Sequence, residues 1–174
     1  MLNNLQAELQ AFGKYVVQQS RSNLTKQKHN VSKNLYNSIH YDLTEKNDDY
    51  TLSFIMDEYG TFLDKGVKGA NPSLVKNGKQ KAPNSPYSYK SKRPPMQPLA
   101  DWAKKRNIRL RDKKGRFKKG NYRTIGFILQ RSIFAQGMKP TMFFTKPFEV
   151  AFERYKKGIN KTLIEDLIDI FKTK

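Results

Sequence analysis

The chain of 174 residues contains no cysteine and only two histidines, His29 and His40. Without cysteine, neither a disulfide nor a thiolate-ligated metal site forms, and the two histidines lack a recognisable zinc-ligand spacing. No apolar run approaches the roughly 20 residues that span a bilayer. Residues 1–5 lack the basic and apolar regions of a signal peptide. We therefore expect a soluble protein made in the cytoplasm, with no membrane partner, metal or other cofactor.

Acidic residues are scarce in one part of the chain. Between Lys65 and Arg123, nineteen Lys or Arg residues face only Asp101 and Asp112, so this window carries +17 of a total formal charge of +19. Outside it, fifteen basic residues stand against thirteen acidic ones. A field concentrated in this way attracts polyanions or the acidic surface of a partner protein. The charge pattern predicts a nearly neutral folded frame that carries a cationic insertion.

Apolar periodicity predicts the first part of this frame. Apolar residues at three- and four-residue steps predict an amphipathic helix over residues 2–20 and a second, short helix over 31–38. The polar segment 20–30 between them is compatible with either a helix or a loop. Residues 39–43 and 50–56 then alternate between apolar and polar side chains, which is typical of strands with one buried face. The polar segment 46–49 between them predicts the turn of a β-hairpin.

The last part of the frame is predicted from residue 121 onward. We expect a helix over 121–134 whose inward residues include Ile125 and Ile128, followed by a third strand over 141–144. A closing helical region should begin at Pro147 and be bent or interrupted at Gly158. The expected fold class is α+β, with a small antiparallel sheet flanked by N-terminal and C-terminal helices.

The cationic insertion, residues 65–120, has little periodicity of its own. Residues 66–95 contain five prolines and three glycines, which indicates a long irregular loop. A short helix from Pro98 should bury Leu99, Trp102 and Ala103. Residues 108–119, here called the basic arm, should form a hairpin that turns at Lys114-Gly115. We interpret the chain as a single domain over 1–174, with its frame in 1–64 and 121–174.

Few residues suggest catalysis. Asp57, Glu58 and Asp64 follow the second predicted strand, and acidic residues at strand ends occur in metal-dependent nucleases. Those enzymes place a lysine two residues after an acidic residue within a strand, whereas Asp64 and Lys65 are adjacent. We therefore interpret these side chains as solvated turn carboxylates. The chain has neither a nucleophile elbow nor a glycine-rich phosphate loop, and we expect no enzyme activity.

The cationic insertion allows three interpretations. It contacts a nucleic-acid backbone, with Tyr87 and Tyr89 interleaved among cations as in surfaces that combine stacking with charge. Alternatively, it is an extended arm that docks on acidic neighbouring subunits, or it is simply a solvated loop. The residues expected to contact a partner or DNA are Lys90, Lys92, Arg93, Arg109, Arg111, Lys113, Lys114, Arg116, Lys118 and Lys119.

Several short segments resemble a known family when they are taken in order. Asn34–Ile39, read Asn-Leu-Tyr-Asn-Ser-Ile, resembles the G-x-L-x-x-S-I signature of small tail-component proteins of tailed bacteriophages. Asp57–Thr61 and Leu63–Gly66 resemble the Glu-x-Gly-Thr segment that follows the central hairpin of that family. Gly137–Phe144 resembles its Pro-and-Phe step before the closing helix. The order of these segments covers most of the chain outside the insertion.

This resemblance implies a head–tail connector, neck or tail-completion protein of a virion. Such proteins have a small α+β fold, assemble as rings at the junction of portal and tail, and have no catalytic activity. The expected partners are other copies of the chain, the portal, connector or tail proteins, and packaged DNA in the lumen of the ring. A stand-alone nucleic-acid-binding protein is the alternative function.

Overall fold

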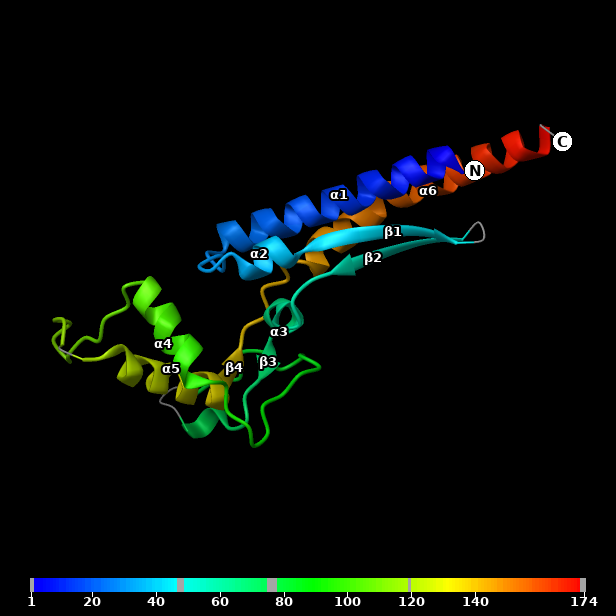
Figure 1. The fold of residues 1–174 in the computed structure, drawn as a ribbon. Helices are drawn as coiled ribbons and strands as arrows, with labels where there is room; N and C mark the ends of the chain where they lie inside the picture. The colour runs from blue at the N-terminus through cyan, green and yellow to red at the C-terminus, as the bar shows by residue number, and fades with distance from the viewer. Residues whose placement is uncertain (1, 47–48, 75–77, 119, 173–174) are drawn as a thin grey trace. The chain divides into compact units, whose positions relative to one another are not determined.

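The computed structural model describes residues 2–46, 49–74, 78–118 and 120–172 (Figure 1). The chain forms two compact units: Met1–Gly60 together with Met142–Lys174, here called the terminal unit, and Thr61–Thr141, here called the central unit. The elements are α1 (Asn3–Lys26), α2 (Asn34–Ser38), β1 (His40–Lys46), β2 (Asp49–Ile55), α3 (Tyr59–Lys65), β3 (Val67–Lys68), the 3₁₀ helix η1 (Pro72–Leu74), α4 (Met96–Lys105), α5 (Tyr122–Gln136), β4 (Gly137–Met138) and α6 (Thr145–Lys172).

The fold is α+β, as predicted. Its main sheet is the antiparallel pair β1–β2, and the N-terminal helix α1 and the C-terminal helix α6 belong to the same unit as this pair. Tyr41 pairs with Phe54 and Leu43 with Leu52, so the apolar side chains of both strands share one face. The predicted turn over 46–49 includes residues 47–48, which lie outside the described residues.

Aromatic rings form the core of the terminal unit. Phe12 of α1 is 5% exposed, and its ring meets those of Phe54, Phe148 and Tyr155 edge-on at centroid distances of 6.1, 5.7 and 5.9 Å. Edge-to-face pairs of this kind contribute about 0.5–1.5 kcal/mol each beyond the burial of their area. The helices α1 and α6 and the hairpin are therefore held together through one aromatic cluster.

Two glycines lie inside the long helices of this unit. Gly13 is buried, and a Cβ atom there would lie 2.7 Å from the ring of Tyr41, so glycine lets β1 approach α1 closely. Gly158 lies against the side chain of Glu8 within one uninterrupted helix, α6. Of the predicted bend or interruption at Gly158, the interruption is wrong, because α6 is one helix from Thr145 to Lys172. In the segment 20–30, for which helix and loop were both open, α1 continues to Lys26, and its buried face includes Ser20 and Leu24, both 0% exposed.

The predicted third strand over residues 141–144 is wrong. Met142 has a φ of 53°, which lies outside the extended region of the backbone. The strand in this part of the chain is β4 instead, which pairs antiparallel with β3 by placing Met138 opposite Val67. A parallel bridge joins Lys68 to Ser88, so a further segment lies beside β3. Residues 66–95 are otherwise largely irregular where described, as predicted.

Helices α4 and α5 pack together in the central unit through small residues. A Cβ atom on Gly126 would lie 2.9 Å from the Cβ atom of Ala100, and Ala100 and Ala103 are buried. This close contact turns Gly126 inward, so Ile128, about 200° further around the helix, is 48% exposed. Trp102 is also exposed, at 39%. The predicted inward positions of these two large side chains are wrong.

The two units differ sharply in charge. The central unit contains twenty-one Lys or Arg residues and three Asp or Glu residues, a formal charge of +18, whereas the terminal unit contains thirteen and twelve, a charge of +1. The predicted insertion 65–120 lies within the central unit, which also includes residues 61–64 and 121–141 that we assigned to the frame. The packing of α5 on α4 explains why α5 belongs with the insertion.

Candidate interaction surface on the central unit

The basic arm is a short hairpin, as predicted. The backbone N–H of Asp112 donates to the carbonyl of Arg116 at 2.8 Å, and that of Lys118 donates to the carbonyl of Leu110 at 2.9 Å. Between them, Gly115 has a φ of +80° and its N–H donates to the carbonyl of Asp112 at 3.0 Å. A turn with this backbone conformation favours glycine.

One carboxylate organises the turn of the arm. The side chain of Asp112 accepts the backbone N–H groups of Lys114 and Arg116, each at 2.9 Å, and the Nε of Arg116 at 3.0 Å. The backbone hydrogen bond from Arg116 is the main reason that the pKa of Asp112 lies below its ordinary value. Asp112 therefore fixes the shape of the arm while it offsets little of the positive charge.

An exposed aromatic ring lies between two arginines of the arm. The guanidinium groups of Arg109 and Arg111 lie 5.6 and 4.2 Å from the ring centroid of Phe117, which is 61% exposed. These cation–π contacts hold both guanidinium groups against the ring of Phe117. Phe117 was not among the residues predicted to make contacts, although it is a single aromatic residue within a run of cations, which is a signal that the sequence contains.

Six of the predicted contact residues lie on this arm with exposed side chains. They are Arg109, Arg111, Lys113, Lys114, Arg116 and Lys118. Lys119 lies outside the described residues. Because Asp112, paired with Arg116, is the one carboxylate between Arg109 and Lys118, these six cations form a surface of strongly positive net charge.

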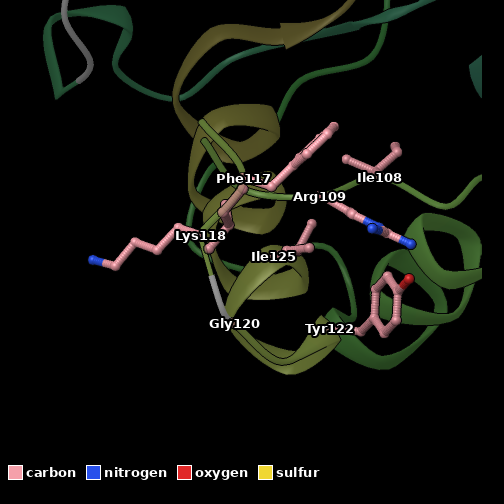
Figure 2. Close-up of a pocket in the computed structure, with 8 residues that line it drawn as sticks. Ile108, Arg109, Phe117, Lys118, Gly120, Tyr122 and Ile125 are labelled. Carbon is pink, nitrogen blue, oxygen red and sulfur yellow. The ribbon is translucent and has the colours of Figure 1, made fainter. Parts of the chain in front are cut away.

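A hollow of about 320 Å³ lies between the arm and the first turns of α5 (Figure 2). Figure 2 shows the side chain of Lys118 extending away from the other labelled residues. The wall of the hollow is formed about equally by polar and apolar atoms, and two cations, Arg109 and Lys118, belong to it. Its lining residues are Ile108, Arg109, Leu110, Phe117, Lys118, Gly120, Tyr122 and Ile125.

The remaining predicted residues, Lys90, Lys92 and Arg93, form a separate group. Their side chains are exposed, and the guanidinium group of Arg93 lies 5.5 Å from the ring centroid of Phe134. Phe134 is twelve residues after Tyr122 on α5, so it lies about 18 Å from the start of that helix at 1.5 Å per residue. The nine predicted residues that the structure describes therefore form two cationic groups towards opposite ends of α5.

The two tyrosines near this second group pack against other rings. Tyr87 meets Phe62 edge-on at 4.7 Å, and Tyr89 lies 6.1 Å from Phe134. The backbone on either side of Ser88 also exchanges hydrogen bonds with Lys68. Burial raises the pKa of Tyr89 above its ordinary value of 10.0. Each ring therefore packs against one aromatic partner, and the stacking of bases on these two tyrosines stays a prediction.

The three carboxylates that were predicted to be solvated differ in their exposure to solvent. Glu58 is exposed and Asp57 is half-buried, but Asp64 is only 3% exposed, so its assignment as a solvated side chain is wrong. Among residues 2–46, 49–74, 78–118 and 120–172, no group of three or more His, Asp or Glu side chains is arranged to hold a metal ion. No described helix combines the length and hydropathy needed to cross a membrane.

The segments that carry the phage resemblance are joined by hydrogen bonds. The hydroxyl of Ser38 donates to the carbonyl of Leu35 at 3.0 Å and accepts the backbone N–H of Asp57 at 3.1 Å, which links the first segment to the second. The hydroxyl of Thr141 donates to the carbonyl of Leu63 at 2.8 Å, which links the second to the third. These motif residues therefore fix the backbone within each unit.

Comparisons of the chain with protein-family models, curated proteins and solved structures gave no match. The class of this protein is therefore inferred from its fold and its distribution of charge alone. It is a small α+β protein in which a nearly neutral unit and a strongly cationic unit belong to one chain.

Proposed function

We propose that this protein is a non-enzymatic structural component of a bacteriophage virion, which forms a ring at the head–tail junction as a connector, neck or tail-completion protein. The observation that carries this proposal is the division of charge between the units, +18 in one and +1 in the other. A ring subunit needs a frame for contacts with its neighbours and a cationic part that faces DNA or acidic partner proteins.

The contacts of the motif residues support the proposal. The short segments that resemble the phage family meet through Ser38 and Thr141, whose hydroxyl groups bond to the backbone of the segment between them. Residues that fix the backbone of a scaffold in this manner suit a structural role. The order of these segments along the chain is the same as in the family that they resemble.

The proposal is tested by mass spectrometry of purified phage particles. A structural component is present in a fixed number of copies per particle and stays with the particle through density-gradient purification. Imaging of the particle at moderate resolution then locates the protein at the junction. If the protein is produced in infected cells but is absent from purified particles, the proposal is wrong.

Nucleic-acid binding by the isolated protein is the second candidate function. It is favoured by the exposed cations of the arm and by the exposed ring of Phe117 between two arginines. Binding to the phosphate backbone weakens with salt, and the slope of log K against log [salt] is about −0.9 per phosphate neutralised. If all six described cations of the arm contact phosphates, the slope for duplex DNA is about −5. A salt-independent or undetectable interaction excludes this candidate.

A further inference from the structure

The basic arm has two faces, and its one carboxylate belongs to only one of them. Arg111 and Phe117 lie directly opposite each other in the hairpin, so their side chains are on the same face. Because successive side chains of a strand point to opposite faces, Asp112 and Arg116 belong to the other face, where they form an ion pair at 3.0 Å. The face of Arg111 and Phe117 therefore has no acidic residue of the arm.

Two arginines meet on this face. The guanidinium group of Arg109 lies over the same ring of Phe117 as that of Arg111, and we call these three residues the arginine face. Among the residues that the structure describes, no carboxylate forms an ion pair with either guanidinium group. One ring thus holds two like charges near each other without a counter-charge, and this arrangement favours a ligand that carries negative charge.

Both guanidinium groups are held in place and keep donors for a ligand. The Nε of Arg109 donates to the side-chain oxygen of Asn107 at 3.2 Å, and the Nη1 of Arg111 donates to the carbonyl of Gly115 at 2.8 Å. The remaining N–H groups of each planar fork fit the oxygens of a phosphate. Because the ring and these hydrogen bonds already orient the side chains, less conformational entropy is lost when a phosphate binds.

The distribution of cations favours a long polyanion. The second cationic group, residues 90–93, lies towards the other end of α5, about 18 Å along the helix at 1.5 Å per residue. A DNA duplex carries one charge per roughly 1.7 Å of its axis, so it offers phosphates to both groups at once. Since two guanidinium groups lie over the ring of Phe117, this ring suits the positioning of phosphate ligands better than the stacking of bases that single strands use.

We propose that the arginine face binds the phosphate backbone of double-stranded DNA. Arg109 and Arg111 donate to phosphate oxygens, and Phe117 is the positioning residue that holds both guanidinium groups. Arg109 and Phe117 also line the hollow beside α5, from which the side chain of Lys118 extends away (Figure 2). This inference deepens the proposed function and rests on it, because it takes DNA as the partner of the cationic unit.

The test measures the affinity of the full-length protein for a short DNA duplex by fluorescence anisotropy over a series of salt concentrations. Arg109→Gln and Arg111→Gln should each make the slope of log K against log [salt] shallower by about 0.9, and should weaken binding about eightfold at about 0.1 M salt. Arg154→Gln is the matched control, because Arg154 is also exposed and lies over two tyrosine rings, at 5.4 and 5.5 Å, but belongs to the terminal unit. It should bind DNA like the wild type.

Phe117→Leu removes the ring without changing the charge. It should weaken binding about fivefold or more, because the guanidinium groups are no longer held in place, while the slope stays that of the wild type. Phe117→Tyr keeps an aromatic ring and should bind like the wild type. All variants change exposed side chains, so each should keep the circular dichroism spectrum of the wild type. Wild-type affinity of Phe117→Leu, or a shallower slope, overturns the positioning role of the ring.

Competitors distinguish duplex DNA from other partners. Single-stranded DNA and polyglutamate should displace the duplex only at a charge concentration about tenfold higher or more. Equal competition by polyglutamate would assign the arm to an acidic protein, and equal competition by the single strand would assign it to unpaired DNA; either result overturns the inference. It is also overturned if the wild type does not bind the duplex or if both arginine variants keep the wild-type slope. A protein that binds DNA in this way but is absent from particles refutes the virion proposal alone.

Discussion

The helix α1 begins without a side-chain cap from its own segment. Its N-cap residue is Leu2, whose side chain cannot accept a hydrogen bond. The carboxylate of Asp166, 161 residues beyond Leu5 in the chain, accepts the backbone N–H of Leu5 at 2.9 Å and the side-chain amide of Asn4 at 2.7 Å. Asp166 is 6% exposed and lies at the positive end of the α1 dipole. It therefore caps α1 from the opposite end of the sequence.

Asp166→Ala should destabilise the terminal unit by about 2 kcal/mol, because a lost cap costs roughly 0.5–2 kcal/mol and a buried, unpaired N–H about 1–3 kcal/mol. With an m value of about 2 kcal/mol/M in urea, this corresponds to a decrease of about 1 M in the midpoint of unfolding. Asp166→Asn should fall between the wild type and the alanine variant, since the amide keeps one acceptor oxygen but loses the charge.

The unfolding of each unit can be followed by a different spectroscopic signal. The one tryptophan, Trp102, lies in the central unit, whereas α1 and α6 contribute most of the helix and therefore most of the far-ultraviolet circular dichroism. For Asp166→Ala, the midpoint of urea unfolding should decrease when it is followed by circular dichroism. It should stay unchanged when it is followed by tryptophan fluorescence. Glu165→Ala is the control, since its exposed ion pair with Lys161 at 3.6 Å should contribute about 0.5 kcal/mol or less. Equal effects of the two substitutions would refute the capping argument.

Three further predictions concern the central unit. Gly137→Ala should destabilise it by about 2 kcal/mol or more, measured by Trp102 fluorescence in urea, because Gly137 has a φ of +82° and its Cβ would meet the backbone of β3; a variant as stable as the wild type would contradict this. Because the pKa of Tyr89 is raised in the folded state, its hydroxyl group stabilises the fold below pH 10.0, and this stabilisation is lost as the pH rises above that value. Tyr89→Phe should therefore lose less stability between pH 9 and 11 than the wild type does. Equal losses in the two proteins would show that another group titrates. Changing five cations of the arm to glutamine should leave a folded protein that assembles or binds DNA poorly, and loss of the circular dichroism signal would show instead that the arm belongs to the core; these five are Lys113, Lys114, Arg116, Lys118 and Lys119.

Periodicity in the sequence was enough to predict most of the elements and the α+β class. The alternation around Leu43 and Leu52 predicted both strands of the hairpin, and the predicted helix over 121–134 agrees closely with α5. The hairpin of the arm followed from the Lys114-Gly115 turn, since glycine adopts a positive φ without strain. These features depend on residues within a few positions of one another, so local physical chemistry decides them.

Predictions that depended on distant contacts were less successful. The outward position of Ile128 depends on the meeting of Gly126 with Ala100 on another helix. The burial of Asp64 depends on the packing of the central unit around it. The two cationic groups are separated because Arg93 stacks on Phe134, far along α5 from the arm. Neither amphipathic periodicity nor the density of charge contains this information.

The amino-acid sequence by itself determined the charge of each segment, the helical and strand periods, and the absence of thiol chemistry, because these are properties of residues and their near neighbours. The tertiary structure alone decided that α5 joins the cationic insertion, that Asp166 caps α1, and which apolar side chains remain exposed. The physical reason is that each of these outcomes depends on which distant surfaces pack together, and a helix of a given amphipathic pattern can bury its apolar face against more than one partner.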